Sequence, residues 1–126
     1  MPAPDDRRYL DSHEWHKLEA DGTVTIGISA FAVDELTDIT YLEIANQDGA
    51  LAAGDTFGEI ESVKATSDLY CGIDGTVIEV NQAAVDDPET INRDCFGEGW
   101  MIRVRPSDRS QLDGLLDAKA YEANHG

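Results

Sequence analysis

Apolar residues alternate with polar or small residues over short stretches of this chain. The alternation is clearest over residues 23–28 and 100–105, where the apolar members are Val24, Ile26 and Ile28, and Trp100, Ile102 and Val104. Successive side chains of a strand point to opposite faces of the sheet, so each stretch predicts a strand with one apolar face. Apolar and β-branched residues predict further strands at residues 41–44, 57–63 and 76–80.

Turn-forming residues separate these stretches at short intervals. Glycine lies next to an acidic residue at Asp21-Gly22, Gly54-Asp55, Asp74-Gly75 and Gly97-Glu98-Gly99. Short strands divided by such turns are typical of two-layer folds. We therefore expect a mainly β protein, an antiparallel sandwich or flattened barrel with short helices.

Two stretches have helical features. Ser29 is placed to cap a short helix over residues 30–36. Pro106-Ser107 precedes a segment with leucines at helical spacing, and Ser107 is the expected N-cap there. These leucines are Leu112, Leu115 and Leu116. Gly114 lowers the helical propensity inside this segment, so its boundaries stay open.

The length and the charge of the chain exclude several classes of function. The 126 residues fit one domain, expected over residues 1–126 with a core at about 9–121. Nine Lys and Arg against 26 Asp and Glu give a net charge of −17, which should repel nucleic acid and anionic lipid surfaces. No apolar run approaches the roughly 18 residues of a membrane span. The acidic, polar N-terminus is unlike a secretory signal, so we expect a cytoplasmic protein.

The acidity has two interpretations. Sixteen of the acids are Asp, and only Lys17, Lys64 and Lys119 are lysines. An acidic surface can simply keep a protein in solution. The shortage of lysine favours adaptation to high salt, where ions screen the self-repulsion of the folded chain.

The sequence does not favour an independent enzyme. It contains no GxSxG, P-loop or GxGxxG motif. His13 and His16 are three residues apart, a spacing that places them on opposite faces of a strand, so they are not expected to share a metal ion. Cys71 and Cys95 form neither a CxxC motif nor a disulfide framework, and we interpret both as small buried residues.

A single lysine stands out in the predicted hairpin of residues 58–70. Lys64 lies between Val63 and Ala65, where one β run ends and another begins. Most lysines at hairpin tips are only solvated charges. In a chain with three lysines, however, an amine on a flexible stem at this place is suited to carry a prosthetic group through an amide bond.

These residues belong to a set of motifs that resembles the H protein of the glycine cleavage system. The attachment motif of that family is similar to ESVKATSD at residues 61–68, and its N-terminal signature to SHEW at residues 12–15. Further similar segments follow in order: GTVIEVN at 75–81, Ile91-Asn92, GEGWM at 97–101, and Leu115 to Tyr121. The resemblance covers about residues 9–121, nearly the whole chain.

Two related classes of carrier fit less well. Biotin carriers usually place methionines beside the modified lysine, whereas lipoyl domains of 2-oxoacid dehydrogenases place Asp before it; here the neighbours are Val63 and Ala65. The chain also departs from the H-protein pattern. Cys71-Gly72 and Cys95 stand where prolines are usual, which affects the expected rigidity of two loops but not the attachment site.

The resemblance implies a fold and a carrier function. The fold would be lipoyl-domain-like, a barrel-sandwich hybrid of two antiparallel sheets with a C-terminal helix. A lipoate ligase or lipoyl transferase would attach lipoate to Lys64. The lipoyl arm would receive an aminomethyl group from the PLP-dependent glycine decarboxylase (P protein) and pass it to the tetrahydrofolate-dependent aminomethyltransferase (T protein). Dihydrolipoamide dehydrogenase (L protein) would then reoxidise it, so the chain is expected to be a carrier and not an enzyme.

The resemblance also implies a cleft for the loaded arm. In the family, residues that match Ser12, Glu14 and Asp68 are associated with a cleft that accepts the ammonium of the arm. Without that resemblance, we would interpret Ser12 and Glu14 as ordinary polar residues of a turn and Asp68 as a solvated residue of the hairpin. A second hypothesis stays open, in which an H-like protein donates lipoate to other lipoyl enzymes or acts only as an interaction module.

Overall fold

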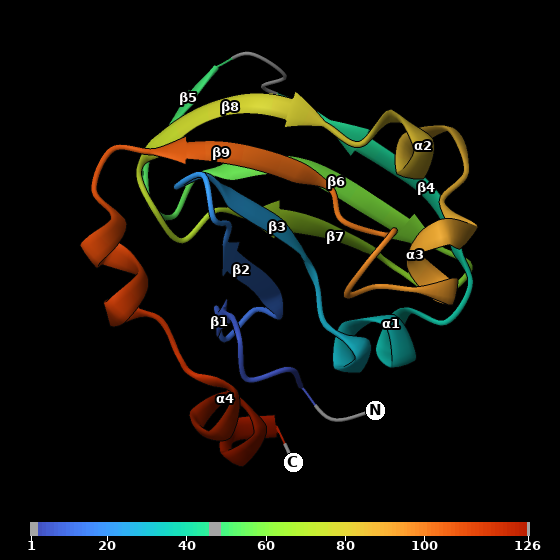
Figure 1. Ribbon diagram of the computed structural model, residues 1–126. Helices are drawn as coiled ribbons and strands as arrows, with labels where there is room; N and C mark the ends of the chain where they lie inside the picture. Colours follow the sequence, from blue (N-terminus) through green and yellow to red (C-terminus); the bar gives the residue numbers. More distant parts are fainter. Residues whose placement is uncertain (1–2, 46–48, 126) are drawn as a thin grey trace.

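A computed structural model describes residues 3–45 and 49–125 and contains two antiparallel sheets (Figure 1). The larger sheet has six strands in the order β1-β2-β3-β9-β8-β5. Its strands are β1 (Arg8–Tyr9), β2 (Glu14–Leu18), β3 (Val24–Ile28), β5 (Ala50–Leu51), β8 (Gly75–Val80) and β9 (Ile102–Pro106). The predicted strands at 23–28 and 76–80 are confirmed within one residue.

The smaller sheet carries the candidate attachment lysine. Its order is β4-β6-β7, with β4 at Ile39–Ile44, β6 at Thr56–Ser62 and β7 at Thr66–Tyr70. β6 and β7 form the hairpin expected around Lys64, with Glu61 opposite Thr66 next to the tip. The mainly β, two-layer fold is confirmed, and the sheets do not close into a barrel.

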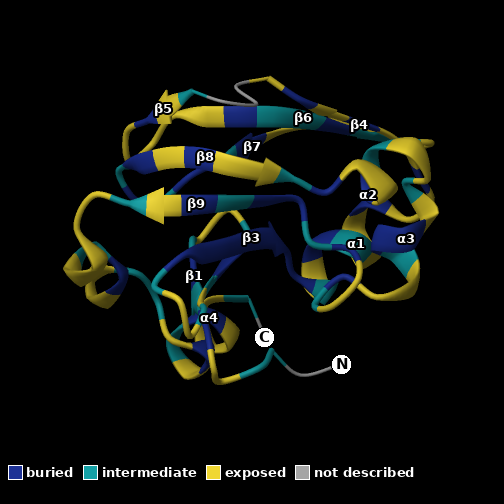
Figure 2. Cartoon of the chain, turned by 45° about the horizontal axis from the view of Figure 1, so that its top comes forward, coloured by how far each residue is buried: buried dark blue, intermediate teal, exposed yellow. Residues whose placement is uncertain are grey.

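The alternating apolar residues build the core between the sheets. Val24, Ile26 and Ile28 are at most 2% exposed and share one hydrophobic cluster with Leu42 and Ile60 of the smaller sheet. Figure 2 shows β3 buried along its whole length, consistent with a central strand of the larger sheet. Burial of apolar side chains from both sheets drives the packing of the two layers.

The alternation breaks at the start of β9. Met101 is fully buried and Trp100 is only partly buried, opposite to the predicted pattern. Trp100 precedes the strand and lies under the guanidinium of Arg103, 5.0 Å from its ring centre. Met101 donates its backbone N–H to Ile26 before the regular register begins at Ile102. The period of two therefore applies only from Ile102 onward.

The helix expected after Ser29 is confirmed. α1 spans Ala30–Leu36, and the Ser29 hydroxyl accepts the N–H of Ala32 at 3.4 Å. Two short helices that the sequence pattern did not predict, α2 (Gln82–Asp86) and α3 (Glu89–Arg93), follow β8. No helix in the described ranges is long and apolar enough to cross a membrane.

A C-terminal helix is confirmed, but its predicted start at Pro106-Ser107 and the predicted N-cap Ser107 are wrong. A 3₁₀ helix, η1, spans Arg109–Gly114 and is capped by Asp108, whose carboxylate accepts the N–H of Ser110 at 3.0 Å. The helix of this region, α4, begins later and spans Ala118–His125. Between them, Leu116 exchanges two backbone hydrogen bonds with Tyr9, which holds the chain extended and prevents one continuous helix.

Candidate functional site

The tip of the β6–β7 hairpin presents Lys64 to solvent. The Ser62 hydroxyl accepts the backbone N–H groups of Lys64 and Ala65, each at 3.1 Å, and Ser62 donates its own N–H to the Ala65 carbonyl. Val63 is 67% exposed and Lys64 is also exposed. In the part of the chain that the structure describes, the Lys64 amine has no hydrogen-bond or ion-pair partner. The tip is thus a firm turn with a free amine.

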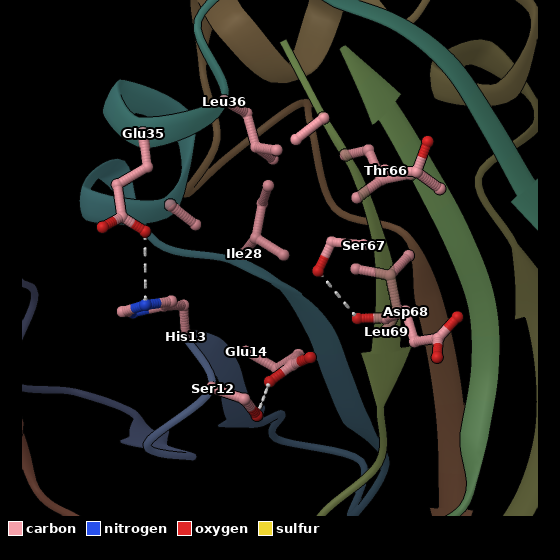
Figure 3. Close-up of a pocket in the computed structure, with 13 residues that line it drawn as sticks. Ser12, His13, Glu14, Ile28, Glu35, Leu36, Thr66, Ser67, Asp68 and Leu69 are labelled. Carbon is pink, nitrogen blue, oxygen red and sulfur yellow. Dashed lines mark hydrogen bonds and ion pairs between the residues drawn. The ribbon is translucent and has the colours of Figure 1, made fainter.

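A cavity of about 260 Å³ lies beside this hairpin, between β7, α1 and the turn before β2 (Figure 3). Its apolar lining comes from both sheets and α1, namely Ile28, Ala32, Leu36, Ile60 and Leu69. Its polar lining includes Ser12, His13, Glu14, Glu35, Ser67 and Asp68. The cavity therefore combines apolar walls with carboxylates.

Glu14 is the buried carboxylate of the cavity. It is only 1% exposed, and its side chain lies between β2 and the end of β7, where it contacts Tyr70. One carboxylate oxygen accepts the Ser12 hydroxyl at 2.5 Å, and the other accepts the backbone N–H of Tyr70 at 2.8 Å. Burial raises the pKa of Glu14, whereas these two hydrogen bonds act in the opposite direction. The result is an oriented acceptor for a cation in a partly dry environment.

Ser12 and Asp68 hold different places around Glu14. Ser12 contacts Glu14 directly through its hydroxyl. Asp68 is exposed at the rim, and Figure 3 shows its carboxylate directed to the far side of β7 from Glu14. Leu69, the next residue along the strand, is buried. The structure thus brings all three predicted residues to one cavity, with Ser12 and Glu14 in contact and Asp68 at its mouth.

His13 and Glu35 line the same cavity, and neither was singled out as a cleft residue from the sequence. The Nε2 atom of His13 lies 3.8 Å from the Glu35 carboxylate, and its Nδ1 atom lies 2.6 Å from the Tyr121 hydroxyl. Burial, and then the nearby His125, lower the pKa of His13. The sequence around His13 and Glu35 does not indicate that they meet. Their contact depends on the pairing of β2 with β3, which places α1 over residues 12–14.

His16 and the two cysteines lie away from this contact. The Nε2 atom of His16 accepts the N–H of Gly72 at 3.0 Å, whereas His13 contacts Tyr121, so the two histidines have different hydrogen-bond partners. Among the described residues, no three potential ligands are grouped to hold a metal ion. Cys71 and Cys95 are buried free thiols, as expected, and burial raises the pKa of each to about 11.

Comparisons with known proteins agree on one family. The family model of the glycine cleavage H-protein matches residues 7–125. The glycine cleavage system H protein of Cyanothece sp. is 55% identical over 120 residues, covering 95% of this chain and 92% of the relative. The probable H protein of Haloarcula marismortui is 48% identical over 118 residues, covering 94% and 92%. The crystal structure of the Mycobacterium marinum H protein matches with a TM-score of 0.90 and 38% identity over 98% of this chain and 99% of that chain.

Proposed function

The chain belongs to the glycine cleavage H-protein family, a family of carriers rather than enzymes, and we propose that it is the lipoyl-bearing shuttle of a glycine cleavage system. One observation carries the proposal: the only lysine of the hairpin lies exposed at its tip, beside a cavity that contains a buried carboxylate. An amine without a partner is open to acylation, and a nearby cavity offers shelter to what is attached.

The residues present fit a lipoyl group. Lys64 offers the amine for the amide bond, and Ile28, Leu36 and Leu69 offer apolar contacts for a hydrocarbon chain and a dithiolane ring. When bound, lipoate supplies a dithiol/disulfide pair that accepts and releases an aminomethyl group. The part of this chain is to hold the arm at its base, exclude water from its loaded end and bind the charge there.

Glu14 is the residue we assign to that charge. A carboxylate about 4 Å from an ammonium gains roughly 4 kcal/mol at an effective dielectric of about 20. The net gain is smaller, because both charges lose water on docking. Ser12 orients the carboxylate through its hydrogen bond, and Asp68, exposed at the rim of the cavity, adds a second negative charge nearby. An arm without an ammonium gains nothing from these acids and stays mobile.

The partners follow from the same proposal. The chain receives its load from glycine decarboxylase (P protein) and delivers it to aminomethyltransferase (T protein). Dihydrolipoamide dehydrogenase (L protein) reoxidises the arm, and a lipoate ligase or lipoyl transferase attaches it, all in the cytoplasm. Residues 1–126 would act as one carrier domain, supported by a main core cluster that draws on both sheets.

Intact mass spectrometry tests the attachment. Lys64→Arg keeps the positive charge but has no amine for the amide bond, so the variant should stay unmodified after incubation with lipoate ligase, lipoate and ATP. The matched control is Lys119→Arg on α4, which should be modified like the original chain. Peptide mapping that finds the group on Lys17 or Lys119 would overturn the assignment.

A further inference from the structure

Two side chains of β2 bind the chain as it leaves the Lys64 hairpin. Glu14 accepts the backbone N–H of Tyr70 at 2.8 Å, and His16 accepts that of Gly72 at 3.0 Å. Glu14 and His16 are two residues apart in a strand, so they share one face of β2. Tyr70 and Gly72 are also two residues apart. The two contacts therefore form successive rungs between the larger sheet and the hairpin.

Both N–H groups lie where the chain leaves the smaller sheet, since Tyr70 ends β7 and Gly72 follows it. β7 is the edge strand of the smaller sheet, so one side of its backbone faces away from β6. Cys71, between the two donors, turns its N–H the other way, to the carbonyl of Asp55 at 2.9 Å. This alternation directs the N–H groups of Tyr70 and Gly72 to the two acceptors on β2.

His16 acts here as an acceptor only in its neutral form. Accepting the Gly72 N–H at Nε2 requires the proton of the neutral ring to lie on Nδ1. Burial lowers the pKa of His16 to about 4, so the ring is neutral at pH 7. In the part of the chain that the structure describes, the buried Nδ1 atom has no hydrogen-bond partner. The contact of Nε2 with Gly72 is thus the polar contact through which this buried ring acts on the hairpin.

We propose that His16 is a positioning residue of the arm site, a second anchor that keeps the hairpin docked on β2 while Glu14 binds the loaded arm. The inference rests on the proposed function. Glu14 has two tasks in that function, because the carboxylate that would bind the ammonium also holds Tyr70. With Gly72 held independently, Glu14 can share its charge with the arm without releasing the base of the hairpin.

Two substitutions at one position separate the acceptor from the bulk of the ring. His16→Leu fills the space but accepts no hydrogen bond, whereas His16→Gln offers an amide oxygen at a similar reach. Amide hydrogen exchange, followed by NMR on the unlipoylated protein, should be about five- to tenfold faster at Gly72 in His16→Leu, the effect of one ordinary hydrogen bond. His16→Gln should restore slow exchange.

The arm itself provides the second readout. In lipoylated protein loaded by glycine decarboxylase, without the transferase, His16→Leu should shorten the lifetime of the loaded arm and His16→Gln should restore it. Equal lifetimes in His16→Leu and the original chain would overturn the positioning role, and so would a Gln variant that decays as fast as the Leu variant.

A further substitution covers the case in which His16→Leu does not fold. His16→Met fills the same space with a flexible side chain whose thioether is only a weak acceptor. Exchange at Gly72 should be faster, and the arm lifetime shorter, in His16→Met than in His16→Gln. Equal values in these two variants would contradict the proposal.

The same experiments distinguish this inference from the proposed function. If the original chain protects its loaded arm no better than free lipoamide is protected in water, the proposed function of the cavity fails. Whether His16 anchors the hairpin is then tested by hydrogen exchange at Gly72 in unlipoylated protein, because that measurement does not involve the arm. Unchanged exchange at Gly72 in His16→Leu would overturn the anchor even if the arm is protected.

Discussion

At the scale of single residues, Glu14 is the group on which the proposed site depends. It is buried, it touches Ser12, and it accepts an N–H from the hairpin that carries Lys64. Asp68 differs from it in exposure and in direction. The two acids are therefore expected to contribute unequally to the protection of a loaded arm.

Neutral variants test this inequality. Glu14→Gln keeps an oxygen for the N–H of Tyr70 but removes the charge, and it should shorten the lifetime of the loaded arm about tenfold, since hydrogen bonds to charged groups are the stronger ones. Asp68→Asn should shorten it only about twofold, because exposed ion pairs contribute little. The measurement is decay of the loaded mass without the transferase. Equal decay rates in the original chain and both variants would show that neither acid binds the loaded arm.

The pH dependence of the lifetime belongs to Glu14 as well. Burial raises its pKa above the ordinary value of 4.5, so Glu14 takes up its proton at a higher pH than an exposed glutamate does. Binding of an ammonium needs the carboxylate, and the lifetime should therefore fall as the pH is lowered through this raised pKa. Glu14→Gln should remove the pH-dependent part. A profile that is identical in both proteins would mean that Glu14 does not bind the ammonium.

The contribution of Glu14 to stability has the opposite sign. The folded chain binds this proton more tightly than the unfolded chain does, so this group alone makes the free energy of unfolding rise as the pH falls through the raised pKa towards 4.5. A shorter arm lifetime in this pH range therefore cannot be ascribed to unfolding caused by Glu14.

At the scale of elements, side-chain contacts hold α4 against the rest of the protein beside the cavity. Tyr121 of α4 stacks on Tyr9 with ring centres 4.7 Å apart. Its hydroxyl lies 2.6 Å from the Ser29 hydroxyl and 2.6 Å from Nδ1 of His13. Burial raises the pKa of Tyr121 to about 12, so the hydroxyl keeps its proton and can donate at neutral pH. One side chain thus joins α4, the N-cap of α1 and a residue that lines the cavity.

Removing the Tyr121 hydroxyl should weaken the packing of α4 against the rest of the protein and lower its stability. Tyr121→Phe keeps the stacking but loses both contacts, a cost of about 1–2 kcal/mol. The midpoint of thermal unfolding should fall by about 4–8 °C in a domain of this size. Lys119→Ala, at an exposed position of the same helix, is the matched control and should leave the midpoint nearly unchanged. A Phe variant as stable as the control would show that stacking alone docks α4.

At the scale of the whole molecule, the charge is unbalanced. The chain has 26 acidic residues and 9 Lys and Arg, so most carboxylates have no cation to pair with. On the smaller sheet, Glu43 pairs with Glu59, which in turn pairs with Asp68, so three acids lie in register across three strands. Like charges in directly opposed positions destabilise a sheet.

Salt should therefore stabilise the folded chain if its acidity is an adaptation to high salt. The midpoint of thermal unfolding should rise between low and molar KCl, because the Debye length falls to about 3 Å at 1 M and repulsion is screened. Glu59→Gln should raise the midpoint at low salt and lose most of that advantage in molar KCl. A midpoint that stays flat or falls with KCl would mean that the acidity serves solubility only.

The sequence by itself determined the features whose cause is local. Alternation with a period of two located β3, because neighbouring side chains of a strand point to opposite faces. Ser29 marked the start of α1, because its hydroxyl can reach an N–H of the first turn. The motif around Lys64 showed both the hairpin and the family resemblance. Each of these signals lies within a few residues of the feature that it predicts.

Only the tertiary structure decided the features that depend on distant partners. The backbone pairing of Leu116 with Tyr9 separates η1 from α4 where the sequence predicted one helical segment, and no residue between 106 and 116 indicates that pairing. Likewise, Glu14 meets Tyr70, and His16 meets Gly72, across 56 residues of sequence. Such contacts arise because two sheets are packed face to face to bury a common core, and their register is set by the whole core rather than by the residues that meet.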